Sequence, residues 1–266
     1  MATERAHHQE TICWEVRDEI GWIRLNRPQA LNALTPAMLA RLETILDRAR
    51  LDAAVRAVVI TGAGAEAFSA GADIRVLNQA TVFEVREFAR LAVSVTSRIE
   101  SLGKVVVAAI NGHAVGGGLE LAEACALRVA APHARLGHPE VRIGAVAGFG
   151  GTTRLPRLIG KGRAAELLLT GRLIDAEEAL RFGLVNRIAP AERLVAETES
   201  LVREILMQAP LAVKLSWEAL HRGLDVGIEQ SAMLGADYFG LVAASDDFRA
   251  GTAAFIEKRR AVYTGS

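Results

Sequence analysis

The sequence predicts an α/β fold in which short buried strands alternate with helices, followed by a C-terminal region made of helices alone. Over the first two thirds of the 266 residues, short apolar runs alternate with longer stretches that have one apolar face. These are the patterns of buried strands and of amphipathic helices. Beyond residue 192 only helical patterns remain. We therefore divide the chain into a core, residues 1–192, and a C-terminal helical region, residues 193–266.

The core is expected to begin with a β-hairpin followed by a helix. Strands are predicted at residues 11–17 and 20–25, because Asp18-Glu19 between them is a typical turn. Thr35 and Pro36 then predict a helix start, with a capping hydroxyl followed by proline at the first helical position. One face of this helix is apolar, through Met38, Leu39, Leu42, Ile45, Leu46 and Ala49.

The strongest helix signal in the core lies at residues 81–102. Thr81 and Glu84 form a capping-box pattern, and apolar residues recur at helical spacing from Phe88 onward. The other predicted elements are buried strands at 57–61, 105–110 and 127–131, a short helix at 119–126, loops at 62–71 and 136–151, and a late strand at 185–188.

Four helices are predicted in the C-terminal region. Their patterns cover residues 194–208, 210–222, 227–244 and 246–260. We expect this region to pack on the core or on another subunit.

Composition excludes several classes of function. Lysine plus arginine number 31 and aspartate plus glutamate number 31, so the net charge of zero gives no support for nucleic-acid or membrane partners. A local basic patch for a phosphorylated ligand stays open. No apolar run approaches the roughly 20 residues of a membrane helix. Cys13 and Cys125 are too few for a disulfide framework, which favours a cytoplasmic protein. The tail around His7 and His8 is expected to be disordered.

Two glutamates stand beside backbone that allows close contact with a ligand. Glu120 follows a triple glycine at residues 116–118, and Glu140 follows Gly137-His138-Pro139. Glycine lets a ligand approach the backbone N–H groups, and Gly117 at a helix start is one candidate donor. The small-residue turn at 69–74 offers a second. Together these predict an acid/base pair beside two amides that hold an oxyanion, which is machinery for stabilising an enolate.

Each of these signals is weak alone. The triple glycine could be a tight turn without a ligand, and the turn at 69–74 is, by itself, more typical of a surface loop. A lone glutamate is usually a solvated charge, and we expect this of Glu123. His138 could be a base, but a loop histidine is more often a pocket-wall or hydrogen-bonding residue.

One competing motif points to dinucleotide binding. Residues 62–67 match G-x-G-x-x-A after a predicted strand. That fingerprint should open directly into a helix, whereas here residues 68–71 extend the loop. We interpret it as a chance match.

Taken together, the motifs resemble the crotonase (enoyl-CoA hydratase/isomerase) family over nearly the whole chain. The matching stretches are residues 25–34, 69–74, 111–120, 137–140, 148–151 and 255–259. The resemblance implies a spiral of ββα units with a C-terminal helical region used in trimer formation. It also implies a homo-oligomer, either a trimer or a dimer of trimers.

The resemblance further implies a coenzyme A thioester substrate. Its thioester oxygen would be bound by the N–H groups of Ala72 and Gly117. Lys258, with Phe255 nearby, would reach the CoA of a neighbouring subunit. The remaining residues in family positions for CoA contact are Ala30, Leu31, Ala70, Ala72, Asp73, Ile74 and Arg75.

Within the family, a pair of glutamates is typical of hydratases. The resemblance thus implies an enoyl-CoA hydratase, a lyase that adds water reversibly and syn to a trans-2-enoyl-CoA to give a 3-hydroxyacyl-CoA. Glu120 would activate a water for attack at Cβ, Glu140 would deliver a proton to Cα, and the loop at Gly148 would lie by the water. No metal or redox cofactor is expected, since CoA is part of the substrate.

Three departures from the family pattern concern the acyl pocket more than the reaction. Ala147 replaces a frequent proline, Phe149 replaces a small residue, and Gln29 stands at an often basic position. Two other readings stay open. One is a different family reaction, such as isomerisation, decarboxylation or thioester hydrolysis. The other is a catalytically silent acyl-CoA-binding protein or assembly subunit.

Overall fold

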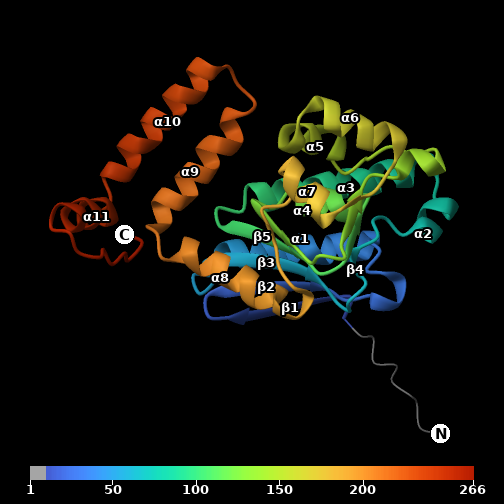
Figure 1. Cartoon of the computed structure of the whole chain (residues 1–266), viewed down its shortest axis with the longest axis horizontal. Coiled ribbons are helices and arrows are strands. Elements are labelled where there is room, and N and C mark those ends of the chain that lie inside the picture. The colour runs from blue at the N-terminus through green and yellow to red at the C-terminus, as the bar shows by residue number, and fades with distance from the viewer. Residues whose placement is uncertain (1–9) are drawn as a thin grey trace, which may run out of the picture.

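Two β-sheets form the centre of the protein, whose residues 10–266 are described by a computed structural model (Figure 1). The expectation about the tail at His7 and His8 concerns residues outside this range. The large sheet has the order β1 (Ile12–Arg17), β2 (Ile20–Leu25), β3 (Ala57–Gly62), β5 (Val105–Ile110), β7 (Leu127–Ala130) and β10 (Arg187–Ile188). The small sheet has the order β4 (Ala67–Ser69), β6 (His113–Val115), β8 (Arg135–Gly137) and β9 (Ile174–Asp175).

The chain winds through both sheets in successive ββα turns, as predicted. One turn consists of β3, β4, α2 (Ile74–Gln79) and α3 (Val82–Glu100), and the next of β5, β6 and α4 (Gly117–Glu123). A third consists of β7, β8, η2 (Glu140–Ile143), α5 (Gly151–Ile159) and α6 (Lys161–Thr170). Because β4, β6 and β8 pair in parallel, the segments that follow them meet at one edge of the small sheet.

Local signals explain where the long helices begin. Helix α1 (Pro36–Leu51) is capped by Thr35, whose hydroxyl accepts a hydrogen bond from the N–H of Met38. In α3, Thr81 and Glu84 form the reciprocal capping box that the sequence predicted. The expected strands at 20–25 and 105–110 are also present with those limits.

The expectation of loops at residues 62–71 and 136–151 was wrong in part. Strands β4 and β8, the 3-10 helix η2 and the start of α5 lie within them. Each of the two strands has three residues, too few to show a period-two pattern, and each is stabilised by pairing with remote strands. The structure also adds β9 and α2, which the sequence patterns did not predict.

Apolar side chains pack on both faces of the large sheet. Helices α1, α3 and α4 cover one face and contribute Leu42, Val95 and Leu119 to the larger core. Helix α8 (Leu194–Leu206) covers the other face, with Leu201 and Val202 among the residues of a second core. Three further short elements lie before α8 in the chain. They are η1 (Pro28–Ala30), α7 (Ala176–Phe182) and η3 (Ala191–Arg193).

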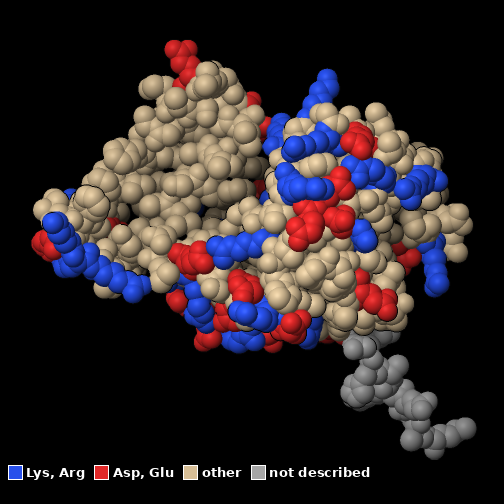
Figure 2. Space-filling model, in the orientation of Figure 1, with Lys and Arg blue, Asp and Glu red and all other residues tan. Residues whose placement is uncertain are grey.

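The last three helices extend away from the sheets. They are α9 (Pro210–Gly223), α10 (Ile228–Ala243) and α11 (Asp246–Ile256), at the left of Figure 1. In Figure 2 the visible face of α9 and α10 is nearly devoid of charged side chains. Helices α9 and α10 expose large apolar residues, including Leu220, Met233 and Phe239. Such an exposed apolar surface is typical of a protein–protein interface.

Candidate active site

The turns after β4 and β6 bring two backbone amides together. A Cβ built on Gly117 would stand 3.5 Å from the nitrogen of Ala72, and one on Gly71 would stand 3.1 Å from the nitrogen of Gly117. Gly71 and Gly116 have φ values of +91° and +54°, which favour glycine. Ala72 lies in a turn, and Gly117 is the first residue of α4. Within residues 10–266, neither N–H group donates to a backbone carbonyl of another loop, turn or strand. They are therefore available to a ligand oxygen.

The turn at Ala72 is fixed by the segment that precedes α1. The N–H of Leu34 donates to the carbonyl of Gly71 at 2.7 Å, and the N–H of Asp73 donates to the carbonyl of Leu34 at 2.8 Å. Arg27 forms an ion pair with Asp73 at 3.1 Å. These contacts hold the turn rigidly against the N-terminal segment.

Several residues predicted to contact CoA lie next to each other. The N–H of Ala70 donates to the carbonyl of Leu31 at 2.9 Å, which places Ala30 and Leu31 beside the turn. Ile74 and Arg75 are exposed at the start of α2. The sequence reasoning missed Asn32, which is fully buried and donates from its side-chain amide to the carbonyls of Ala63 and Ala67. Its left-handed φ of +56° and its burial become visible only in the fold.

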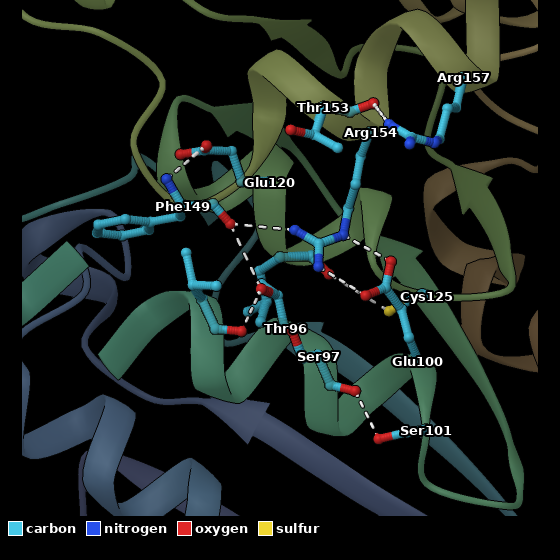
Figure 3. Close-up of polar contacts among 12 residues, drawn as sticks. Thr96, Ser97, Glu100, Ser101, Glu120, Cys125, Phe149, Thr153, Arg154 and Arg157 are labelled. Carbon is cyan, nitrogen blue, oxygen red and sulfur yellow. Dashed lines mark hydrogen bonds and ion pairs between the residues drawn. The ribbon is translucent and has the colours of Figure 1, made fainter. Parts of the chain in front are cut away.

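Glu120 is buried on α4 and held by two backbone amides. Its Oε1 accepts from the N–H of Phe149 at 2.7 Å (Figure 3). The same oxygen accepts from the N–H of Gly151 at 2.6 Å. A Cβ at Gly151 would lie 3.0 Å from this oxygen, so glycine leaves room for the carboxyl group. Burial raises the pKa of Glu120 to about 7, against the opposing effects of the Gly151 hydrogen bond and the charge of His138.

Phe149 connects Glu120 to helices α3 and α5. Its carbonyl accepts from Thr96 at 3.4 Å and from Arg154 at 3.1 Å, and Arg154 also forms an ion pair of 2.6 Å with Glu100 (Figure 3). Gly148, the predicted water-positioning residue, is exposed and immediately precedes Phe149. The amides that bind Glu120 are thus those of Phe149 and Gly151. The glycine-rich sequence indicated this loop but not which N–H groups point inward.

Glu140 lies across from these groups at the start of η2. Its Oε1 would stand 2.8 Å from a Cβ built on Gly116, and its Oε2 is buried without a hydrogen-bond partner. The charge of Glu140 contributes to the raised pKa of Glu120. The structure thus brings both glutamates to the same edge of the small sheet as the two free amides.

His138 and Glu123 complete a buried polar cluster behind Glu140. His138 Nε2 lies 2.9 Å from Glu123 Oε1, so His138 is the hydrogen-bonding residue that the sequence favoured. The expectation that Glu123 is a solvated charge was wrong, because its side chain is fully buried against His138. Helix α4 turns Glu123 inward, one turn after Glu120, so both face the interior.

An apolar cavity of about 500 Å³ lies between α2 and α3. Val76, Leu77, Phe88 and Leu91 are among its lining residues. Phe88 meets the ring of Phe149 edge-on, with ring centroids 5.2 Å apart. Phe149 in turn covers Gly117, since a Cβ there would lie 2.6 Å from the ring. The cavity and the two amides are therefore separated by one aromatic side chain.

Lys258 is not brought to this site within one chain. It follows α11, which lies at the opposite side of Figure 1 from α2. The dinucleotide interpretation of residues 62–67 is excluded by the fold, because those residues enter strand β4 and not a helix. In residues 10–266 no cluster of His, Cys, Asp and Glu could hold a metal ion. No helix of that range could span a membrane.

Comparison with known proteins agrees with this architecture. The enoyl-CoA hydratase/isomerase family profile matches residues 15–266. A crotonyl-CoA hydratase of Syntrophomonas wolfei is 42% identical over 95% of this chain and 97% of that protein. A short-chain-enoyl-CoA hydratase of Clostridium acetobutylicum is 41% identical over 94% and 95% of the two chains. The crystal structure of an enoyl-CoA hydratase from Bacillus anthracis superposes with a TM-score of 0.93 at 38% identity, covering 97% of this chain and all of that one. The chain therefore belongs to the enoyl-CoA hydratase/isomerase family.

Proposed function

We propose that the protein is an enoyl-CoA hydratase that adds water to a trans-2-enoyl-CoA and forms a 3-hydroxyacyl-CoA. One observation carries this proposal: two carboxyl groups, buried on Glu120 and partly buried on Glu140, stand at the same edge of the small sheet as the free amides of Ala72 and Gly117. The relatives named as hydratases support it, since they match nearly the whole chain.

In this mechanism the two amides stabilise the negative charge that develops on the thioester oxygen. Glu120 is fixed through Oε1, which leaves Oε2 to bind a water and accept its proton as the hydroxyl attacks Cβ. The electrons of the double bond move onto the thioester oxygen to give an enolate. Glu140 then donates its proton to Cα. The proton that Glu120 took from the water passes to Glu140, and this restores the starting state of both carboxyl groups. The loop at Gly148 borders this water.

The surroundings of the site fit the parts of an acyl-CoA. The segment from Ala70 to Arg75, together with Ala30 and Leu31, would contact CoA, and the cavity between α2 and α3 would take the acyl chain. Lys258 would contribute from a second copy. These groups and the two carboxyls supply the chemistry, so we propose that no metal or redox cofactor takes part. Dialysis against EDTA should leave the activity unchanged.

We propose that the protein assembles as a trimer or a dimer of trimers through α9–α11. Their exposed apolar side chains support this, since a monomer would leave them in water. We also propose a cytoplasmic location, since Cys13 and Cys125 are both free thiols in the described residues. Light scattering coupled to gel filtration should give the mass of three or six chains, and a monomeric mass would contradict the assembly.

The test of the proposed function is crotonyl-CoA hydration, followed by the loss of enoyl absorbance. Glu120→Gln and Glu140→Gln should each lose about 10²-fold or more in kcat, the effect expected for general acid/base groups. Glu66→Gln, a matched change at an exposed glutamate, should retain full activity.

Other outcomes separate the competing functions. Isomerisation of an enoyl-CoA that survives in Glu120→Gln would favour an isomerase. Tight acyl-CoA binding by the wild type without turnover of crotonyl-CoA or longer enoyl-CoAs would indicate a silent binding protein.

A further inference from the structure

The imidazole of His138 is fixed on three sides inside the protein. Its Nε2 is 2.9 Å from Glu123 Oε1, and its Nδ1 is 3.7 Å from Glu140 Oε1. Its Cε1 would lie 2.8 Å from a Cβ built on Gly151. The side chains of His138 and Glu123 are both fully inaccessible to solvent. The ring therefore lies between Glu123, to which it is hydrogen-bonded, and Glu140, to which Nδ1 makes no hydrogen bond.

The carboxyl group of Glu123 has His138 as its hydrogen-bond partner. Its Oε2 is buried without a hydrogen bond, and an ionised carboxylate out of water is costly unless it is paired. Burial by itself lowers the pKa of His138, but the charge and hydrogen bond of Glu123, helped by Glu140, raise it to about 10. His138 consequently carries a positive charge at neutral pH.

The other charged groups around the cluster have separate partners. Arg128 donates to the carbonyls of Leu184, Cys125 and Ala122 and acts on Glu123 only through its charge. Arg154 pairs with Glu100 on α3. Glu120 and Glu140 are the carboxyls that face His138 from α4 and η2. His138 is thus the cation in contact with Glu140.

We propose that Glu123 and His138 form a positioning pair that holds the side chain of Glu140 in place and keeps a positive charge near Glu120. This inference rests on the proposed function. Neither residue touches the substrate. The pair acts through the two glutamates, keeping Glu120 able to accept the proton of the attacking water.

Removing the positive charge should move the acid limb of the pH profile of kcat/KM. The charge of His138 lowers the pKa of Glu120, so its loss raises that pKa and shifts the limb to higher pH. The acid limb of the wild type is expected near pH 7. We expect His138→Gln to shift this limb upward by about one pH unit or more, the usual effect of losing a nearby opposite charge. Activity with crotonyl-CoA at pH 7 should then fall about five-fold or more and recover at pH 9, with KM unchanged.

The two partners should behave as one unit. Glu123→Gln removes the charge that keeps His138 protonated, but it also removes a charge that raises the pKa of Glu120, so it should shift the limb upward by less than His138→Gln does. The double variant should match Glu123→Gln. His133→Gln makes the same substitution at an exposed histidine and should leave the profile unchanged. A purely structural role would lower activity equally at every pH, and a limb that stays in place in both variants would overturn the proposal.

A second measurement needs neither substrate nor active variants. In wild-type protein labelled at the histidine Cε1 carbons, the His138 resonance is identified by its loss in His138→Gln. It should remain that of an imidazolium to above pH 9, and titration of His138 below pH 8 would refute the pair. If the wild type fails to hydrate any enoyl-CoA, the proposed function fails, while this titration still decides whether the charged pair exists.

Discussion

Replacing Glu120 by glutamine should abolish hydration and yet stabilise the folded protein above neutral pH. The carboxyl of Glu120 is buried, and burial raises its pKa from the ordinary 4.5 to about 7. A glutamine keeps the oxygen that accepts from Phe149 and Gly151 but cannot ionise. The variant is therefore relieved of the cost of a buried charge.

The size of the effect follows from the two pKa values. A carboxyl group whose pKa is higher in the folded state lowers the free energy of unfolding as pH rises above its unfolded pKa. This loss of unfolding free energy reaches its full value once the pH is above the folded pKa. The interval from 4.5 to about 7 corresponds to about 3 kcal/mol at pH 8, and less than about 1 kcal/mol is expected at pH 5.

Urea denaturation followed by tryptophan fluorescence measures this difference. Wild type and Glu120→Gln should be compared at pH 5 and pH 8 at one protein concentration, with Glu66→Gln as the exposed control. We expect a gain in unfolding free energy of about 3 kcal/mol at pH 8 that falls below about 1 kcal/mol at pH 5. An equal gain at both pH values, or a loss at pH 8, would refute the assignment of a buried, ionising Glu120.

Three further changes test other parts of the site. Gly117→Ala places a methyl carbon 2.6 Å from the Phe149 ring and beside the proposed oxyanion site. The kcat/KM for crotonyl-CoA should therefore fall about 10²–10³-fold. A steady-state kcat/KM within about three-fold of wild type would contradict this. Phe149→Leu keeps the backbone amide but removes the ring next to the cavity. The kcat/KM for 2-decenoyl-CoA, divided by that for crotonyl-CoA, should therefore rise about ten-fold. An unchanged ratio would show that this ring does not limit chain length. Arg154→Met leaves Glu100 largely buried without its partner and should lower unfolding free energy by about 3 kcal/mol, most of which Glu100→Gln in the same chain should restore.

Elements with local signals were predictable from the sequence. The hairpin of β1 and β2 was predicted from the Asp18-Glu19 turn between two strand patterns, and α1 and α3 were predicted from Thr35 and the Thr81/Glu84 box. Strands β4 and β8 were missed because three residues carry no pattern, and their partners are distant in the chain. Their position depends on tertiary pairing, which no window of sequence contains.

The candidate site was predictable in its motifs but not in its supports. Glu120 and Glu140 were identifiable because each follows unusual backbone. Glu123 was taken for a solvated charge because nothing in its neighbourhood in the sequence signals burial. Its partner, His138, is fifteen positions away and meets it only when β8 pairs beside β6. Phe149 and Gly151 likewise contact Glu120 through backbone N–H groups, which any residue type possesses.

The ββα winding separates the chemistry of the site from its choice of substrate. The groups proposed to react come from three successive turns, with Ala72 after β4, Gly117 after β6 and Glu140 after β8. The cavity between α2 and α3 belongs almost entirely to the first of these turns. With the proposed acyl site in this cavity, substitutions or length changes within residues 74–91 should alter the size of acyl group that is accepted, while the strand pairing that aligns the carboxyls and amides stays intact. A fold built in this way allows the catalytic step to be retained while one helical segment diversifies.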